Sequence, residues 1–186
     1  MKVDVLAIPA VKVLTPRRFS DNRGWFSESY NRNLLKEAGI DLDFVQDNHS
    51  FSANVGTVRG LHYQSPPFAQ DKLVRVIRGS VLDVVVDVRD GSPTQGQWVS
   101  VELSAKNGMQ LFVPVGFLHG FITQEPDTEL VYKVTDYYSS ECDGAVRWDD
   151  PDLKIDWGSC ANSAVLSSKD QSAASYRDFM TPFSYL

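Results

Sequence analysis

The sequence has very few of the residues that build disulfide frameworks, and it has no run of residues that would cross a membrane. Its two cysteines, Cys142 and Cys160, match no metal-binding spacing and are too few for a disulfide framework. A reducing cytoplasm is therefore the expected location. No apolar stretch is long enough to span a bilayer. The first residues include an acid, Asp4, and no long apolar core, so no signal peptide is predicted there.

Positive charge is also in short supply. The chain has 18 Lys and Arg residues against 24 Asp and Glu residues, which gives a formal net charge of −6 at pH 7. Such a chain is poorly suited to bind nucleic acid, and any phosphate site must be a local group of cations inside an acidic shell. The sequence contains no Gly-rich dinucleotide fingerprint, so no redox cofactor is indicated.

Strand patterns separated by turn residues fill most of the chain, and helical patterns are rare. Residues 3–14 predict one or two strands broken at Pro9, residues 15–24 predict a loop, and residues 25–30 predict a further strand. One short helix is expected over residues 31–38, because its first residue is an asparagine suited to cap a helix and a glycine follows its end.

The later strands indicate an antiparallel fold. Residues 81–88 place aliphatic side chains on one face and two aspartates on the other. Asn107-Gly108 predicts a hairpin turn, and the polar tail after residue 139 is expected to hold one short helix. Many short strands at even spacing predict one domain over residues 1–186, all-β, as a sandwich or barrel of the jelly-roll type.

The densest group of chemically useful side chains lies between residues 58 and 78. One strand carries Arg59 and His62, and the next begins at Lys72. Strict alternation would put Arg59 and His62 on opposite faces unless a bulge intervenes. Histidine can accept a proton near neutral pH, and Arg and Lys can hold a phosphorylated or enolising substrate. A lone strand histidine is more often structural, so further residues must support a catalytic role.

Those further residues are His119, Tyr132 and Asp170. An aspartate can orient a histidine base, a tyrosine across a cavity can return a proton, and a lysine or second histidine can stabilise an enolate oxygen. The set fits proton removal beside a ketone and reprotonation from the other face, which is epimerisation. A metal site is the rival interpretation, but no second His or Glu closely follows His62, and His119 is alone on its strand.

Several stretches, spread in order over nearly the whole chain, together resemble one enzyme family. They are Arg23–Tyr30 (RGWFSESY), Phe44–His49 (FVQDNH), Val58–Gln64 (VRGLHYQ), Lys72–Val76 (KLVRV), Asp83–Arg89 (DVVVDVR), Leu111–Phe121 (LFVPVGFLHGF), Tyr132–Ser139 (YKVTDYYS), Trp148–Pro151 (WDDP) and Leu166–Asp170 (LSSKD). In these stretches the chain resembles the dTDP-4-dehydrorhamnose 3,5-epimerase family. The resemblance implies a cupin-like jelly roll, a homodimer and no metal or other cofactor. It implies an isomerase that converts dTDP-4-dehydro-6-deoxy-D-glucose to dTDP-4-dehydro-L-rhamnose, in dTDP-L-rhamnose synthesis.

The resemblance also implies a role for each matching residue. His62 would be the base that removes the protons at C3 and C5, Asp170 its orienting partner and Tyr132 the proton donor. Lys72 would stabilise the enolate, and His119 would bind nearby. The implied substrate-binding residues are Arg23 and Arg59 at the diphosphate, Glu28, Gln46 and Asn48 at the nucleotide, Phe26 and Tyr138 at the thymine, and Asp143 and Lys169 at further positions. Part of the N-terminal segment would reach into the partner subunit's site.

Three alternatives stay open on the sequence. Relatives in other deoxysugar pathways epimerise only C3 or only C5 with the same residues. A jelly roll that binds a sugar nucleotide without catalysis would need neither His62 nor Tyr132. A metal-dependent cupin oxygenase would need a bound metal and would be inhibited by a chelator. Labelling of the two carbons in heavy water separates the first two alternatives from the main interpretation.

Overall fold

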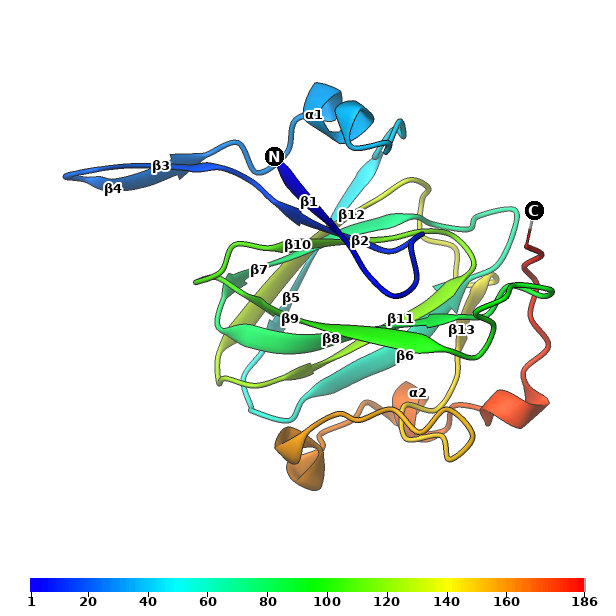
Figure 1. The fold of residues 1–186 in the computed structure, drawn as a ribbon. Helices are drawn as coiled ribbons and strands as arrows, with labels where there is room; N and C mark the ends of the chain where they lie inside the picture. The colour runs from blue at the N-terminus through cyan, green and yellow to red at the C-terminus, as the bar shows by residue number, and fades with distance from the viewer. Residues whose placement is uncertain (186) are drawn as a thin grey trace.

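Two antiparallel β-sheets face each other in the structure, a computed structural model that describes residues 1–185 (Figure 1). In spatial order, the larger sheet contains β1 (Lys2–Val5), β2 (Lys12–Thr15), β10 (Gln110–Val113), β7 (Lys72–Arg78), β12 (Thr128–Val134) and β5 (Gln46–Ser52). The smaller sheet contains β13 (Asp143–Ala145), β6 (Val58–Gln64), β11 (Phe117–Thr123), β8 (Ser80–Asp87) and β9 (Trp98–Ser104). The predicted all-β, cupin-like jelly-roll sandwich is confirmed.

The smaller sheet is buried on both faces, and β8 shows how the sequence achieves this. Val81 and Val85 pack into the core between the two sheets. Val84 and Val86 point the other way, into a second core that contains Trp157 from the C-terminal segment. Strand alternation places these sets on opposite faces, and a sheet covered on both sides has apolar residues at both sets of positions.

The C-terminal segment, expected to be a polar tail with one short helix, supplies the cover for this outer face (Figure 1, yellow to red). It contains the short helix α2 (Ser168–Gln171), two 3₁₀ turns at Ser159–Ser163 and Tyr176–Asp178, and strand β13. The expected helix is present. The apolar residues of the C-terminal segment were not predicted to belong to the core, because their spacing follows neither a strand nor a helix period.

The loop predicted over residues 15–24 is wrong. This segment holds β3 (Arg18–Asp21), which pairs with β4 (Gly24–Ser27) in a hairpin that projects from the sandwich (Figure 1, blue). Arg18 fixes its base, because the guanidinium donates hydrogen bonds to the carbonyl oxygens of Lys106 and Ala105 at 2.6 and 2.7 Å. It also lies 4.2 Å from the centre of the Trp25 ring.

The predicted helix is present as α1 (Arg32–Glu37). The Asn31 side chain caps it by accepting hydrogen bonds from the backbone N–H groups of Asn33 and Leu34. No helix within residues 1–185 is long and apolar enough to cross a membrane.

The hairpin predicted at Asn107-Gly108 is also wrong. The turn is present, since the Asn107 side-chain oxygen accepts hydrogen bonds from the backbone N–H groups of Ser104 and Met109 at 3.1 and 3.0 Å. However, it connects β9 of the smaller sheet to β10 of the larger sheet. Turn residues predict a change of direction, and they do not determine which strands pair afterwards.

Candidate active site

A cavity of about 420 Å³ lies between side chains of the two sheets and the C-terminal segment. It brings together six of the residues predicted from the sequence, namely Arg59, His62, Lys72, His119, Tyr132 and Asp170. They come from β6, β7, β11, β12 and α2. Inward-facing side chains from separate strands commonly meet in this way in a small sandwich or barrel.

Arg59 and His62 both face this cavity because β6 carries a bulge. His62 is opposite His119 on β11, and Arg59 is opposite Phe121. Between these pairs β6 advances by three residues and β11 by two, so β6 contains one extra residue. An extra residue resets the alternation of side chains, so the bulge named as the exception to strict alternation is present in this strand. Gly60 lies in the bulge with φ +140°, where a Cβ would meet the β11 backbone at 2.5 Å.

His62 is held by a buried carboxylate. Its Nε2 lies 2.5 Å from Oδ1 of Asp170, which is 108 residues away in sequence. The other carboxylate oxygen, Oδ2, accepts a hydrogen bond from the Ser167 hydroxyl at 3.0 Å, while Ser167 caps α2 by accepting from the backbone N–H of Asp170. With Nε2 directed at Asp170, Nδ1 is the His62 nitrogen left to take a proton from a ligand.

Asp170 stays ionised at neutral pH despite its position. Burial would raise the pKa of its carboxyl, but the hydrogen bonds from His62 and Ser167, together with the charges of His62 and Lys169, leave the pKa below its usual value. A carboxylate in contact with a histidine stabilises the imidazolium that forms when the ring accepts a proton. Sequence reasoning assigned no role to Ser167, although a serine three residues before an aspartate is a common helix cap.

Lys72 and Tyr132 are two protonated side chains that line the cavity. Burial lowers the pKa of Lys72 to about 8, against the opposing charges of Asp83 and Asp143. Burial raises the pKa of Tyr132, and the nearby Arg59 only partly offsets this. At neutral pH Lys72 is therefore mostly a cation and Tyr132 a neutral phenol, so both can donate hydrogen bonds.

His119 makes a second contact between imidazole and carboxylate. Its Nε2 lies 2.9 and 3.1 Å from the two oxygens of Asp83, which is fully buried. The sequence pattern places Asp83 on the strand face opposite the aliphatic residues, but nothing in the pattern indicated a function for this aspartate. Within residues 1–185, no three His, Cys, Asp or Glu side chains are grouped so that they could hold a metal ion.

Five further predicted residues form one connected polar group beside the cavity. The Tyr138 hydroxyl donates to Asp143 at 3.2 Å, and the Lys169 ammonium lies 2.5 Å from the same carboxylate. The Gln46 oxygen accepts from the backbone N–H of Tyr138 at 3.2 Å, and its amide nitrogen donates to Asn48 at 2.9 Å. In the register of β5 and β12, Asn48 lies directly opposite Tyr132. These groups could recognise a nucleotide at the edge of the cavity.

Three predicted residues lie elsewhere. Arg23 is at the tip of the projecting hairpin, where it pairs with Asp21 at 2.6 Å. Phe26, on β4, is 67% exposed. Glu28 follows the hairpin and lies within 3.4 Å of the Asn31 amide. None of the three lines the cavity of its own chain.

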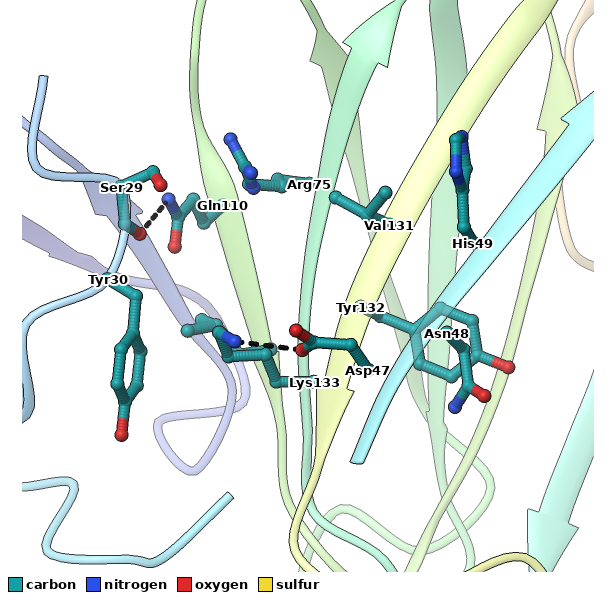
Figure 2. A pocket seen from close by; sticks show the side chains of 11 residues that line it. Ser29, Tyr30, Asp47, Asn48, His49, Arg75, Gln110, Val131, Tyr132 and Lys133 are labelled. Carbon is teal, nitrogen blue, oxygen red and sulfur yellow. Dashed lines mark hydrogen bonds and ion pairs between the residues drawn. The ribbon is translucent and has the colours of Figure 1, made fainter. Parts of the chain in front are cut away.

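A second cavity, of about 280 Å³, lies on the outer face of the six-stranded sheet (Figure 2). Lys133 pairs there with Asp47 at 2.8 Å, and Gln110 donates to the carbonyl oxygen of Ser29 at 2.7 Å. The Gln110 side-chain oxygen is buried without a partner. Arg75 has no side-chain hydrogen bond or ion pair to any residue in the described part of the chain.

Comparison with known proteins identifies the family of the chain. The profile of the family described as dTDP-4-dehydrorhamnose 3,5-epimerase matches residues 5–178. The protein of that name from Sinorhizobium fredii is 51% identical over 181 residues, which cover 97% of this chain and 92% of the relative. The chain belongs to the dTDP-4-dehydrorhamnose 3,5-epimerase family. This epimerase is therefore an isomerase.

Solved structures agree with this epimerase in fold. The dTDP-4-dehydrorhamnose 3,5-epimerase of Bacillus anthracis, determined with TDP and PPi bound, is 48% identical, with a TM-score of 0.91. That match covers 94% of this chain and 98% of the other. An enzyme from Legionella pneumophila, in complex with dTDP-4-keto-L-rhamnose, is 41% identical, with a TM-score of 0.93 over 100% of this chain and 99% of the other.

Proposed function

We propose that this epimerase converts dTDP-4-dehydro-6-deoxy-D-glucose to dTDP-4-dehydro-L-rhamnose by inverting C3 and C5, in the synthesis of dTDP-L-rhamnose. The observation that carries the proposal is that a base and an acid share one cavity but come from opposite sheets. His62, paired with Asp170, lies on β6 of the smaller sheet, and Tyr132 lies on β12 of the larger sheet. Inversion requires that a proton leave one face of the sugar and return to the other, and this arrangement supports both steps.

The proposed chemistry needs only the groups in the cavity. A proton on a carbon beside the 4-keto group can be removed because the resulting charge moves to the keto oxygen. Nδ1 of His62 takes this proton, and Asp170 stabilises the imidazolium. Lys72, as a cation, stabilises the enolate oxygen, with His119 nearby. Tyr132 then returns a proton from the opposite side, and the sequence repeats at the second carbon.

Substrate recognition is proposed to depend on the local cations in an otherwise acidic chain. The Arg59 guanidinium lines the cavity and is held by the carbonyl oxygen of Phe51 at 3.0 Å and the hydroxyl of Ser52 at 3.3 Å. A guanidinium held in this way is suited to the substrate diphosphate. Tyr138 offers an exposed aromatic face to the thymine. The two cysteines are free thiols, which supports the reducing cytoplasm as the place of the reaction.

Turnover in heavy water tests this function. The enzyme is incubated with dTDP-4-dehydro-6-deoxy-D-glucose in D₂O, and the sugar is analysed by NMR. Deuterium is expected at both C3 and C5, because each carbon loses a proton to the base and regains one that has exchanged with solvent. Deuterium at one carbon would instead indicate a single-position epimerase. Deuterium at neither carbon would indicate a binding protein, and loss of turnover with a chelator would indicate a metal enzyme.

The β3–β4 hairpin is proposed to complete the site of a second copy in a homodimer. Three aromatic side chains on it, Phe19, Trp25 and Phe26, are about half exposed or more. Arg23, matched to substrate binding, does not line the cavity of its own chain. Exposed aromatic residues on a projecting arm are typical of surfaces covered by another chain. The unpaired Arg75 on the outer face of the larger sheet supports a covered surface there as well.

Mixed dimers test this exchange. Arg23→Ala damages the arm and His62→Ala removes the base, so each variant alone is expected to be nearly inactive. In a mixed dimer, the body that keeps His62 receives an intact arm from its partner, so one of the two sites is complete. Random mixing should restore about a quarter of wild-type activity, because half of the dimers are mixed and half of their sites work. A mixture no more active than its components, or a monomer by mass measurement, would contradict the exchange.

A further inference from the structure

A buried carboxylate lies behind the cavity, and the proposed mechanism does not use it. Asp83 on β8 is fully buried, and both of its oxygens lie within 3.1 Å of Nε2 of His119 on β11. In the strand register His119 is opposite Val85, and Asp83 is opposite Phe121. The two side chains are therefore diagonal neighbours on the face that points into the sandwich, a spacing across which long side chains reach one another.

This contact decides which nitrogen of His119 can meet a ligand. Both carboxylate oxygens lie within hydrogen-bond distance of Nε2 and act as acceptors, so the ring places its N–H at Nε2. Nδ1 is then the ring nitrogen left for the substrate. His119 is itself 93% buried, with relative exposure of 7%, and lines the cavity. A ring held at one nitrogen by a buried carboxylate has a defined tautomer and orientation.

We propose that Asp83 is a positioning residue for the epimerisation, which holds His119 through Nε2 so that Nδ1 is directed to the substrate. The inference rests on the proposed function, because it assigns His119 a contact with that substrate. Asp83 acts through His119 and need not touch the sugar nucleotide. It forms a second imidazole–carboxylate pair, separate from that of His62 and Asp170.

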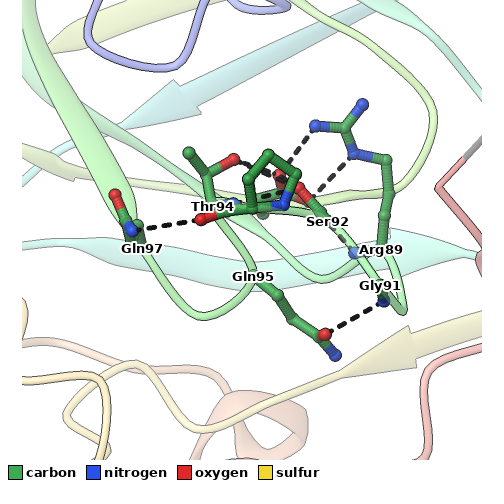
Figure 3. A network of polar contacts seen from close by, with 8 residues as sticks. Arg89, Gly91, Ser92, Thr94, Gln95 and Gln97 are labelled. Atoms are coloured by element: carbon green, nitrogen blue, oxygen red, sulfur yellow. Dashed lines mark hydrogen bonds and ion pairs between the residues drawn. The ribbon is translucent and has the colours of Figure 1, made fainter.

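Asp87 provides a matched control on the same strand. It is also fully buried, but its carboxylate accepts hydrogen bonds from Arg89, Ser92 and Thr94, all of them outside the cavity. Figure 3 shows these three donors in one polar network. Although burial opposes ionisation, these bonds lower the pKa of Asp87 to about 2. Asp87→Asn therefore removes an equally buried charge without touching the substrate or His119. Any general cost of losing a buried carboxylate from β8 should appear in this variant.

The kinetic test compares the two variants under the same conditions. Asp83→Asn is expected to lower kcat/KM by about 10- to 100-fold, the range found when the orienting carboxylate of a metal-bound histidine is removed, which is a comparable contact. Asp87→Asn is expected to stay within about twofold of wild type for the folded enzyme. Asp83→Asn should add almost no further loss to His119→Asn, because the two act as one unit. Equal kinetics for the two aspartate variants, or full additivity with His119→Asn, would overturn the inference.

A measurement on the wild-type enzyme keeps the inference testable even if Asp83→Asn fails to fold. ¹⁵N NMR of the histidine side chains should show His119 with its proton on Nε2, and the Nδ1 signal should shift when dTDP-4-dehydro-6-deoxy-D-glucose is added. In Asp83→Asn, whose amide can either donate or accept, the fixed tautomer should be lost. A proton on Nδ1 of His119, with none on Nε2, would overturn the inference about Asp83 and leave the proposed function intact. Absence of turnover by wild-type enzyme would overturn the proposed function instead.

Discussion

Replacing His62 with alanine is expected to lower the rate of epimerisation by about 10³-fold, the middle of the range for loss of a general base. The structure provides no second imidazole in the same position, since the only other histidine that lines the cavity within residues 1–185, His119, is held by Asp83. Deuterium uptake at C3 and at C5 should fall together, because one base is proposed to serve both carbons. Both are measured by NMR in D₂O.

Binding should survive this substitution. Arg59, Gln46 and Tyr138 are unaffected by it, so calorimetric titration with dTDP should give an affinity close to that of the wild-type protein. His49→Ala is the matched control, because His49 lies on β5 and pairs with Glu129 at 2.9 Å, outside the cavity. It should stay within about twofold of wild type. Normal exchange in His62→Ala would show that the base is misassigned, and loss at only one carbon would require a second base.

Local periodicity was sufficient for much of the fold, because it reports which face of a strand is buried. The alternation in β8 predicted that Val84 and Val86 lie on the face opposite Asp83, and the structure confirms this division, although Val81 and Val85 make the aspartate face apolar as well. The period fails where one strand gains a residue relative to its neighbour. The bulge at Gly60 depends on the register with β11, which no local pattern in β6 encodes.

The N-terminal hairpin escaped prediction for a different reason. Turn residues in residues 15–24 predicted a loop, whereas Asp21 and Gly24 are paired at the end of a two-stranded arm. Exposed Trp25 and Phe26 also break the rule that apolar strand residues point into a core. Such an arm has no core within its own chain, so the pattern of the chain alone cannot describe it.

The candidate site depended on long-range contacts even more. His62 and Asp170 are 108 residues apart, and nothing in their neighbouring sequences links them. The resemblance to the family placed them together, and the structure brings them into contact. The catalytic and binding roles of these residues stay predictions. The contact shows that the base can be oriented, whereas the heavy-water and variant experiments decide whether it reacts.

Replacing Tyr132 with phenylalanine is expected to reduce formation of the inverted product by about 10²-fold while proton removal continues. The ring still fills its place on β12, but the phenolic proton is lost. Burial raises the pKa of this tyrosine, so in the wild-type enzyme the phenol keeps its proton across the neutral range and can act as an acid. Without it, His62 can return a solvent-derived deuteron to the face from which it took the proton. Recovered substrate should therefore carry deuterium without inversion.

The ratio of deuterium in recovered substrate to product formed is the decisive quantity, because it separates the return of the proton from its removal. A rise in this ratio would identify Tyr132 as the acid on the far side of the sugar. Tyr176→Phe is the control, since Tyr176 packs against Phe179 in the C-terminal segment and does not line the cavity. Equal losses of exchange and product in Tyr132→Phe would mean that the hydroxyl supports substrate binding or enolate formation. The inverted face would then receive its proton from another group.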